Sequence, residues 1–400
     1  MERPPPGRAG AVRRRWQRVH RWLGIGAGLV FALAGVTGGL LVFYVEIDAW
    51  ANPQLAPAEP CAHPRGPDDV LAALRATHPL RAGSWRIEFP MTPAQPYTAR
   101  YMKPAESAGR GFAPLVVTVD PCSLAVTGSR LWGSFAMTWI YDLHYTLLLE
   151  RPGRWALGVA GMLMLVSVAS GIVLWWPRTP PRRRVLRLVP RPGRVRATWD
   201  VHWMSGVYGL VVLLPVLITG VFLALPEWLN PVIDRLAPPQ PVLVPAAHAP
   251  VTRMTGTHAP AAEPSAWLSL EAAVAAGLRQ FPDAEPRWIE TPADRHGAIA
   301  VRMRQPHEPS RRFPRSRVWI DPYTGELLAL RDPRADGAGD TLLAWLHPLH
   351  NGEAFGLAGR IAVLVSGLVP PILLVTGLMR WRQRADAQRR ARGHGHGRVG

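Results

Sequence analysis

Four long runs without a charged residue constrain the fold of this chain more than any other feature. They cover residues 23–45, 155–176, 203–225 and 361–379. Each is close to the roughly 20 apolar residues that an α-helix needs to cross a hydrocarbon core about 30 Å thick. Tryptophans stand at several of the run ends, as is typical of a membrane interface. Buried helices of a large soluble domain are the less favoured alternative, so we expect four transmembrane helices.

The chain contains an internal repeat that includes its histidines. Residues 141–178 align without a gap with residues 347–384, and residues 18–41 align with residues 200–223. The identical residues at matched positions include His144 and His350, Gly153-Arg154 and Gly359-Arg360, Gly171 and Gly377, Trp175 and Trp381, His20 and His202, Gly24 and Gly206, and Thr37-Gly38 and Thr219-Gly220. We therefore expect each half to consist of a span, an exported domain and a second span.

The net charge of +18 is concentrated beside the spans. Residues 1–22, 177–198 and 380–400 carry seven, eight and seven arginines, against only Glu2 and Asp386. The positive-inside rule then places both termini and the middle loop in the cytoplasm. A nucleic-acid-binding protein could have the same total charge, but basic segments that adjoin spans favour a lipid bilayer as partner and no nucleic acid. The N-terminal apolar run is longer than the 7–15 residues typical of a signal peptide, so we expect it to be a retained span.

The expected organisation follows from these boundaries. In chain order it is a cytoplasmic N-terminus (1–22), a first span (23–45), a periplasmic domain (46–140), a histidine-containing interfacial segment (141–154), a second span (155–176), a cytoplasmic loop (177–198), a third span (199–225), a linker (226–266), a second periplasmic domain (267–346), a second interfacial segment (347–360), a fourth span (361–379) and a cytoplasmic tail (380–400).

The two exported segments have similar predicted elements. The first shows a helix at 67–77 and strands near 85–89, 97–102 and 115–120. The second shows a helix at 268–281 and strands near 287–290, 298–304 and 317–321. Each ends on an Asp-Pro turn, which predicts two small α+β domains. The Pro- and Ala-rich residues 226–266 predict a linker with little regular structure.

The only two cysteines of the chain, Cys61 and Cys122, both fall in the first exported segment. In an oxidising compartment they can form a disulfide that staples this domain. The alternative is two unrelated thiols, and the sequence leaves both open.

Five of the thirteen histidines lie at or near the mouth of a span: His20, His144, His202, His347 and His350. A single histidine at a membrane interface is usually a hydrogen-bonding or headgroup contact, but four in repeat register indicate function. The topology places His20 and His202 at the inner level and His144 and His350 at the outer level. His347 is the second choice at the outer level, because only His350 has a counterpart in the repeat.

Two imidazoles on opposing helices are what a six-coordinate b-type haem requires, so we expect two haems, one at each level. Covalent attachment is excluded by the absence of a C-x-x-C-H motif. Zinc is less favoured, because two histidines leave its tetrahedral shell incomplete. Arg18 and Arg21 at the inner level, and Arg154 and Arg360 at the outer level, can meet haem propionates or act as ordinary topology determinants. No catalytic residue can be assigned.

The chain resembles the PepSY-associated transmembrane family in three motifs: R-x-H-R-W-L-G at 18–24, L-H…G-R at 143–154 and again at 349–360, and D-P-x-T-G at 321–325. The first exported segment departs from the last motif, with Cys-Ser-Leu at 122–124. The family includes inner-membrane reductases that bind haem and release iron from ferric siderophores in the periplasm. The resemblance thus implies PepSY-like domains, a bacterial inner-membrane location, and His20, His144, His202 and His350 as haem ligands.

These observations favour a haem-containing electron carrier with a periplasmic acceptor, which the resemblance implies to be a ferric siderophore. No G-x-G-x-x-G motif follows a predicted strand, so we expect an external electron donor, a quinone or a cytoplasmic reductase. One alternative is a membrane-anchored regulator whose exported domains bind a peptide or peptidase. Another is a siderophore permease, for which four spans without a broken-helix polar site offer a thin transport path.

Overall fold

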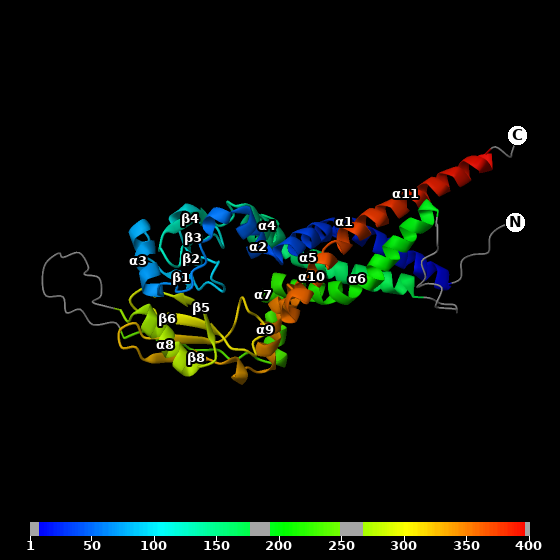
Figure 1. Ribbon diagram of the computed structural model, residues 1–400. Coiled ribbons are helices and arrows are strands. Elements are labelled where there is room, and N and C mark those ends of the chain that lie inside the picture. The colour runs from blue at the N-terminus through cyan, green and yellow to red at the C-terminus, as the bar shows by residue number, and fades with distance from the viewer. Residues whose placement is uncertain (1–7, 177–192, 249–266, 397–400) are drawn as a thin grey trace. The chain divides into compact units, whose positions relative to one another are not determined.

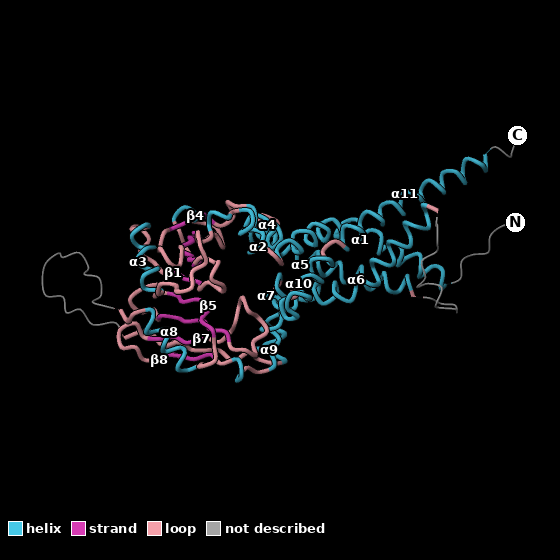
Figure 2. The backbone as a smooth tube through the Cα atoms, viewed as in Figure 1, coloured by secondary structure: helices cyan, strands magenta, loops and turns pink. Residues whose placement is uncertain are grey.

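The computed structural model describes residues 8–176, 193–248 and 267–396. Its chain divides into two compact units. The membrane unit comprises Met1–Phe43, Ile140–Leu229 and Leu349–Gly400, and the β unit comprises Tyr44–Trp139 and Asn230–Pro348. Figure 2 shows that the strands all lie in the β unit, whereas the membrane unit is helical.

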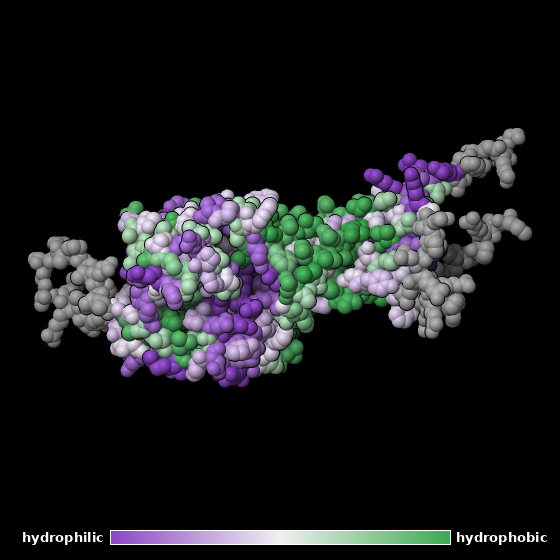
Figure 3. Space-filling model, viewed as in Figure 1, coloured by the Kyte–Doolittle hydropathy of each residue, from purple (hydrophilic) through white to green (hydrophobic). Residues whose placement is uncertain are grey.

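The long helices of the membrane unit are α1 (Arg8–Leu41), α5 (Glu150–Trp175), α6 (Arg194–Ala224), α10 (Gly356–Ser366) and α11 (Val369–His396) (Figure 1). They contain four stretches long and apolar enough to cross a membrane, which confirms the four predicted spans. Helix α1 packs against α5 and α11, and α6 packs against the same two helices, so α1 and α6 are diagonal partners in a four-helix bundle. Apolar residues cover the bundle surface that is visible in Figure 3, as contact with lipid requires.

The fourth span is interrupted between two helices. Helix α10 ends at Ser366 and α11 begins at Val369. Pro370 and Pro371 follow the interruption, and because proline has no N–H they cannot donate to the carbonyls one turn earlier. The backbone of α1 approaches the break closely, since a Cβ atom on Gly35 would lie only 2.7 Å from the carbonyl oxygen of Gly367.

The β unit is built on one eight-stranded antiparallel sheet with the order β4-β3-β2-β1-β5-β6-β7-β8. Its strands are β1 (Trp85–Glu88), β2 (Tyr97–Tyr101), β3 (Leu115–Val119), β4 (Val126–Leu131), β5 (Glu285–Glu290), β6 (Ile299–Arg304), β7 (Arg317–Ile320) and β8 (Leu327–Arg331). The two expected domains are therefore joined, because β1 pairs with β5 and Ile87 lies opposite Ile289. Each half also has a fourth strand, β4 or β8, beyond the three that the sequence predicted.

Helices α3 (Pro67–Thr77) and α8 (Leu270–Gln280) provide the side chains that cover one face of this sheet. Alternate strand residues point into this core, and Ile87, Val117 and Val301 are fully buried there with Leu74 of α3. The remaining helices are α2 (Tyr44–Ala51), α4 (Ala136–Thr146), α7 (Pro226–Leu236) and α9 (Ala338–His350). Helix α7 lies in the predicted linker, so that segment is more regular than expected; residues 249–266 of the linker lie outside the described residues.

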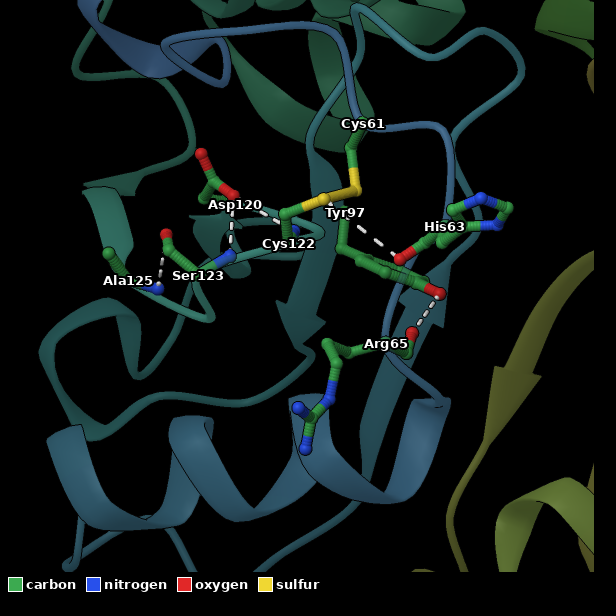
Figure 4. Close-up of a disulfide and its surroundings, with 8 residues drawn as sticks. All are labelled: Cys61, His63, Arg65, Tyr97, Asp120, Cys122, Ser123 and Ala125. Carbon is green, nitrogen blue, oxygen red and sulfur yellow. Dashed lines mark hydrogen bonds between the residues drawn. A yellow bond between two sulfur atoms is a disulfide. The ribbon is translucent and has the colours of Figure 1, made fainter.

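Cys61 and Cys122 form a disulfide, with their Cα atoms 5.8 Å apart (Figure 4). Asp120 caps the turn that contains Cys122, accepting the backbone N–H of Cys122 and of Ser123 at 2.9 Å each. The departure from the D-P-x-T-G pattern places Leu124 at φ 61°, where the second turn has Gly325 at φ 75°. A leucine in this left-handed conformation costs roughly 1–2 kcal/mol.

Candidate functional site

Four histidines of the membrane unit form two facing pairs. The ring centroids of His20 on α1 and His202 on α6 are 6.3 Å apart, with their planes at 89°. The ring centroids of His144 on α4 and His350 on α9 are 6.2 Å apart, with their planes at 41°. The structure thus brings together the histidines that the repeat assigned to the same level, and each pair contains one histidine from each half of the chain.

The outer histidines are both held through Nδ1 by a neighbouring span. Nδ1 of His144 lies 3.1 Å from the carbonyl oxygen of Ala34 and 3.2 Å from Oγ1 of Thr37 on α1. Nδ1 of His350 lies 3.0 Å from the carbonyl oxygen of Val216 and 3.2 Å from Oγ1 of Thr219 on α6. These contacts place a carbonyl and a hydroxyl of the span on the same ring nitrogen.

The inner histidines are held in the same way by the other two spans. Nδ1 of His20 lies 3.0 Å from both the carbonyl oxygen of Ser167 and Oγ of Ser170 on α5. Nδ1 of His202 lies 2.8 Å from Oγ1 of Thr376 on α11. Every span therefore supplies one hydroxyl side chain to one histidine.

The hydroxyl groups settle which ring nitrogen carries the proton. Thr37, for example, donates its own hydroxyl hydrogen to the carbonyl of Leu33 at 2.8 Å, and Thr376 donates to that of Ile372 at 2.6 Å. Thr219 and Ser170 likewise donate to carbonyls of their own helices. Because these hydrogens are used within the helices, the hydroxyl oxygens accept from Nδ1–H. The Nε2 atom of each ring then keeps its lone pair for a ligand, as in histidines that bind metals.

Each of these hydroxyl residues is followed by a glycine that lies against the same ring. A Cβ atom added to Gly38 would be 2.7 Å from Cε1 of His144, and one added to Gly220 would be 2.9 Å from Cε1 of His350. The corresponding distances are 3.1 Å from Gly171 to His20 and 3.6 Å from Gly377 to His202. We call these four dipeptides, Thr37-Gly38, Ser170-Gly171, Thr219-Gly220 and Thr376-Gly377, the hydroxyl–glycine cradles.

These glycines occupy matched positions of the internal repeat, Gly38 with Gly220 and Gly171 with Gly377, but the sequence alone indicated no role for them. The signal that could have revealed them is a hydroxyl residue followed by glycine in every span, although the third and fourth spans each contain a second such dipeptide, Ser205-Gly206 and Ser366-Gly367. Glycine permits a ring to lie flat against a helix, because it has no side chain to hold the ring away.

The spacing of the rings fits a metal ion bound between them. An imidazole nitrogen lies about 2 Å from a metal ion that it binds, so the centres of two rings on opposite sides of one ion are roughly 6 Å apart. Both pairs have this separation. Within the described part of the chain, no group of three or more His, Cys, Asp or Glu side chains could hold a metal ion. Each pair offers two imidazoles, so a metal ion bound between them would have to bring its other ligands with it.

Three of the four candidate arginines contact other groups of the chain. Arg18 and Arg21 are exposed, and Arg21 lies over the ring of Trp22. Arg154 forms an ion pair with Glu227. Arg360 donates to the carbonyl oxygen of Val42 at 2.8 Å and lies over the ring of Phe43.

His347 belongs to the β unit and is not part of either pair. Its ring lies 4.9 Å from that of Phe313, in an edge-to-face arrangement. The ring contacts of His347 and His350 therefore differ, although both residues lie on α9.

Two charged residues near the inner pair were not found from the sequence. Asp200 is only 2% exposed; it accepts a hydrogen bond from Nε1 of Trp203 and pairs with Arg196 at 3.0 Å. Arg380, one turn beyond Gly377 on α11, is close enough to His202 for its charge to act on the ring. The repeat could not reveal them, because Arg18 and Leu174 occupy the matching positions in the first half.

The chain was compared with known proteins and protein families. Curated protein sequences give no match to it. The model of the PepSY-associated TM region matches residues 17–384, which include all four spans and both histidine pairs. This multi-pass membrane protein therefore belongs to the PepSY-associated TM family.

Proposed function

We propose that the membrane unit binds two b-type haems, one at each histidine pair, and carries electrons across a bacterial inner membrane. The donor would be a quinone or a cytoplasmic reductase, and the acceptor a periplasmic compound such as a ferric siderophore. The observation that supports this most is the opposed arrangement of two imidazoles at each level, each anchored through Nδ1 with Nε2 left to bind a ligand. When bound, haem supplies reversible one-electron chemistry at its iron.

The residues of the chain would perform three tasks at these sites. The hydroxyl–glycine cradles fix the tautomer and the direction of each imidazole, which is the usual role of groups behind a metal ligand. The carbonyls that share Nδ1 make the rings better electron donors. The apolar side chains of the spans exclude water, which influences the potential at which iron changes its oxidation state.

The two histidine pairs lie near opposite ends of the spans. His20 belongs to the inner pair, and Gly38 lies against His144 of the outer pair. Both residues are on α1, so 18 residues separate the two levels along this helix. At 1.5 Å per residue this is about 27 Å, close to the thickness of a hydrocarbon core. The basic segments adjoin the His20 level, so we place the termini and that level on the cytoplasmic side.

Haem stoichiometry in histidine variants tests the proposal. We expect two low-spin b-type haems in the detergent-purified chain, reducible by dithionite. His20→Ala and His202→Ala should lose the same haem, and His144→Ala and His350→Ala should lose the other. His347→Ala is the matched control and should keep both. A colourless protein from cells with ample haem would refute haem binding, and any other grouping of losses would refute the two-level arrangement.

A further inference from the structure

One face of the sheet in the β unit is covered by α3 and α8, and the opposite face carries a row of arginines. Strand pairing places Trp288 beside Arg302, and Arg302 beside Arg317, on adjacent strands of this second face. In the neighbouring row, Arg86 of β1 lies opposite Glu290 of β5. We call these five residues the arginine cluster.

The cluster has more positive than negative charge. Glu290 is its only carboxylate, and it pairs with both Arg86 and Arg317. No carboxylate of the described residues lies within ion-pairing distance of Arg302, whose Nη1 donates instead to the carbonyl oxygen of Pro314 at 3.0 Å. Three guanidinium groups thus share one paired carboxylate, and the charge of Glu308 also acts on Arg302, so the local charge is about +1.

The ring of Trp288 holds two of the guanidinium groups in place. Arg302 lies 4.7 Å and Arg86 lies 5.2 Å from the Trp288 ring centroid, both within cation–π range. Arg317 makes a similar contact with Trp319 at 4.7 Å. These contacts orient the cations without neutralising them.

Unused hydrogen-bonding capacity accompanies the excess charge. The Nε atoms of Arg302 and Arg317 are buried and have no hydrogen-bond partner. Burial, followed by the nearby charge of Arg317, lowers the pKa of Arg302 to about 10. A largely buried cation that no ion pair neutralises is costly to a fold, and an anion bound beside Arg302 would offset this cost. About a fifth of the Arg86 and Arg317 side-chain surface stays exposed, so the cluster can be reached from solution.

We propose that the arginine cluster is a binding site for a small multivalent oxyanion, a molecule with several carboxylate or phosphate groups. Planar guanidinium groups bind both kinds of oxyanion through paired N–H donors. Trp319, which is half-buried, adds a flat surface against which the body of the ligand can pack. This site is in the β unit and is independent of the proposed haem sites.

Titration of the full chain in detergent with citrate and, separately, with pyrophosphate tests the proposal and distinguishes the two sources. We expect at least one of these anions to bind, measured by calorimetry and by a rise in the melting temperature of the β unit, and to bind more weakly as salt is added. Arg302→Gln and Arg317→Gln should each weaken binding about ten- to a hundredfold, because each removes charge-assisted hydrogen bonds.

Arg279→Gln is the matched control, since Arg279 is an exposed arginine on α8 with the same charge. It should bind as the wild type does. Arg302→Lys keeps the charge but loses the paired donors, so it remains informative if Arg302→Gln does not fold; it should bind more weakly than the wild type. Failure of both anions to bind the wild type, or equal binding by wild type and the folded cluster variants, would overturn the proposal. Neither result depends on haem content.

Discussion

Alanine substitution of the four cradle glycines tests the histidine sites one ring at a time. An added Cβ atom would lie 2.7 Å from the His144 ring at Gly38 and 2.9 Å from the His350 ring at Gly220. Both distances are shorter than real Cβ contacts, so the ring or the helix must move. At Gly171 the contact with His20 is tight, at 3.1 Å, whereas at Gly377 the contact with His202 is ordinary, at 3.6 Å.

The size of the expected loss of haem affinity follows from the hydrogen bonds that a displaced histidine ring would lose. His144 is held by hydrogen bonds of 3.1 and 3.2 Å, which lengthen beyond the usual range if the ring retreats by half an ångström or so. Overpacking of this kind costs about 1–3 kcal/mol, which corresponds to a loss of haem affinity of roughly 5- to 150-fold. The helix itself should not be weakened, since alanine favours a helix over glycine by about 1 kcal/mol.

Haem content per protein and the dithionite-reduced spectrum are the measurements. We expect Gly38→Ala and Gly220→Ala to lose much of the outer haem, Gly171→Ala to lose less of the inner haem, and Gly377→Ala to retain both. Gly26→Ala is the control on α1, because no atom outside its own neighbourhood lies within 4 Å of an added Cβ there. Equal losses in Gly377→Ala and Gly38→Ala, or full haem content in Gly38→Ala, would refute the cradle geometry.

Three further outcomes are expected. Cys122→Ser should lower the stability of the β unit by about 4 kcal/mol in thermal or chemical unfolding, because the disulfide closes a loop with a sequence separation of 61. Burial raises the pKa of Asp321, but hydrogen bonds from His248 and from the backbone of Tyr323 and Thr324 outweigh this effect and lower the pKa overall. The Asp321 carboxylate should therefore stabilise the fold above about pH 4, and this stabilisation should be lost as the pH falls further. Asp321→Asn should remove this loss from the pH–stability profile. The two haems should give different low-spin ferric electron paramagnetic resonance signals, since the imidazole planes are at 89° in one pair and 41° in the other, and one shared signal would contradict this geometry.

Local sequence patterns predicted most elements of the fold. The helix expected at 67–77 is α3 to the residue, because Pro67 begins it and apolar residues recur at helical spacing. Strands β1, β2 and β3 lie within one residue of the predicted ranges at each end. The spans were equally clear, since a run of about 20 apolar residues has few other uses.

Long-range and edge features were not predictable in the same way. The pairing of β1 with β5 joins segments about 200 residues apart, and the sequence of either strand alone does not indicate which strand it pairs with. The edge strands β4 and β8 have few buried residues, so they lack the alternation that marks a strand. The break before Val369 was visible as Pro370-Pro371, but the apolar run around it concealed its effect.

The repeat predicted which histidines would lie together, but not what holds them. It matches His20 to His202 and His144 to His350, and these are the pairs that face each other in the structure. The contacts behind the rings come from other spans, so a comparison of each histidine with its own counterpart could not reveal them.

The two halves agree in the groups that touch the rings and differ in the charges beside the inner pair. Asp200 stands where the first half has Arg18, and Arg380 stands where it has Leu174. The charge of Arg380 acts on His202, whereas the buried carboxylate of Asp200 accepts a hydrogen bond from Trp203 and pairs with Arg196. If haems bind at both levels, as proposed, the charge of Arg380 beside His202 would help to give them different potentials. The direction of electron transfer along the bundle would then be set at the inner level, where the two halves of the chain have different residues.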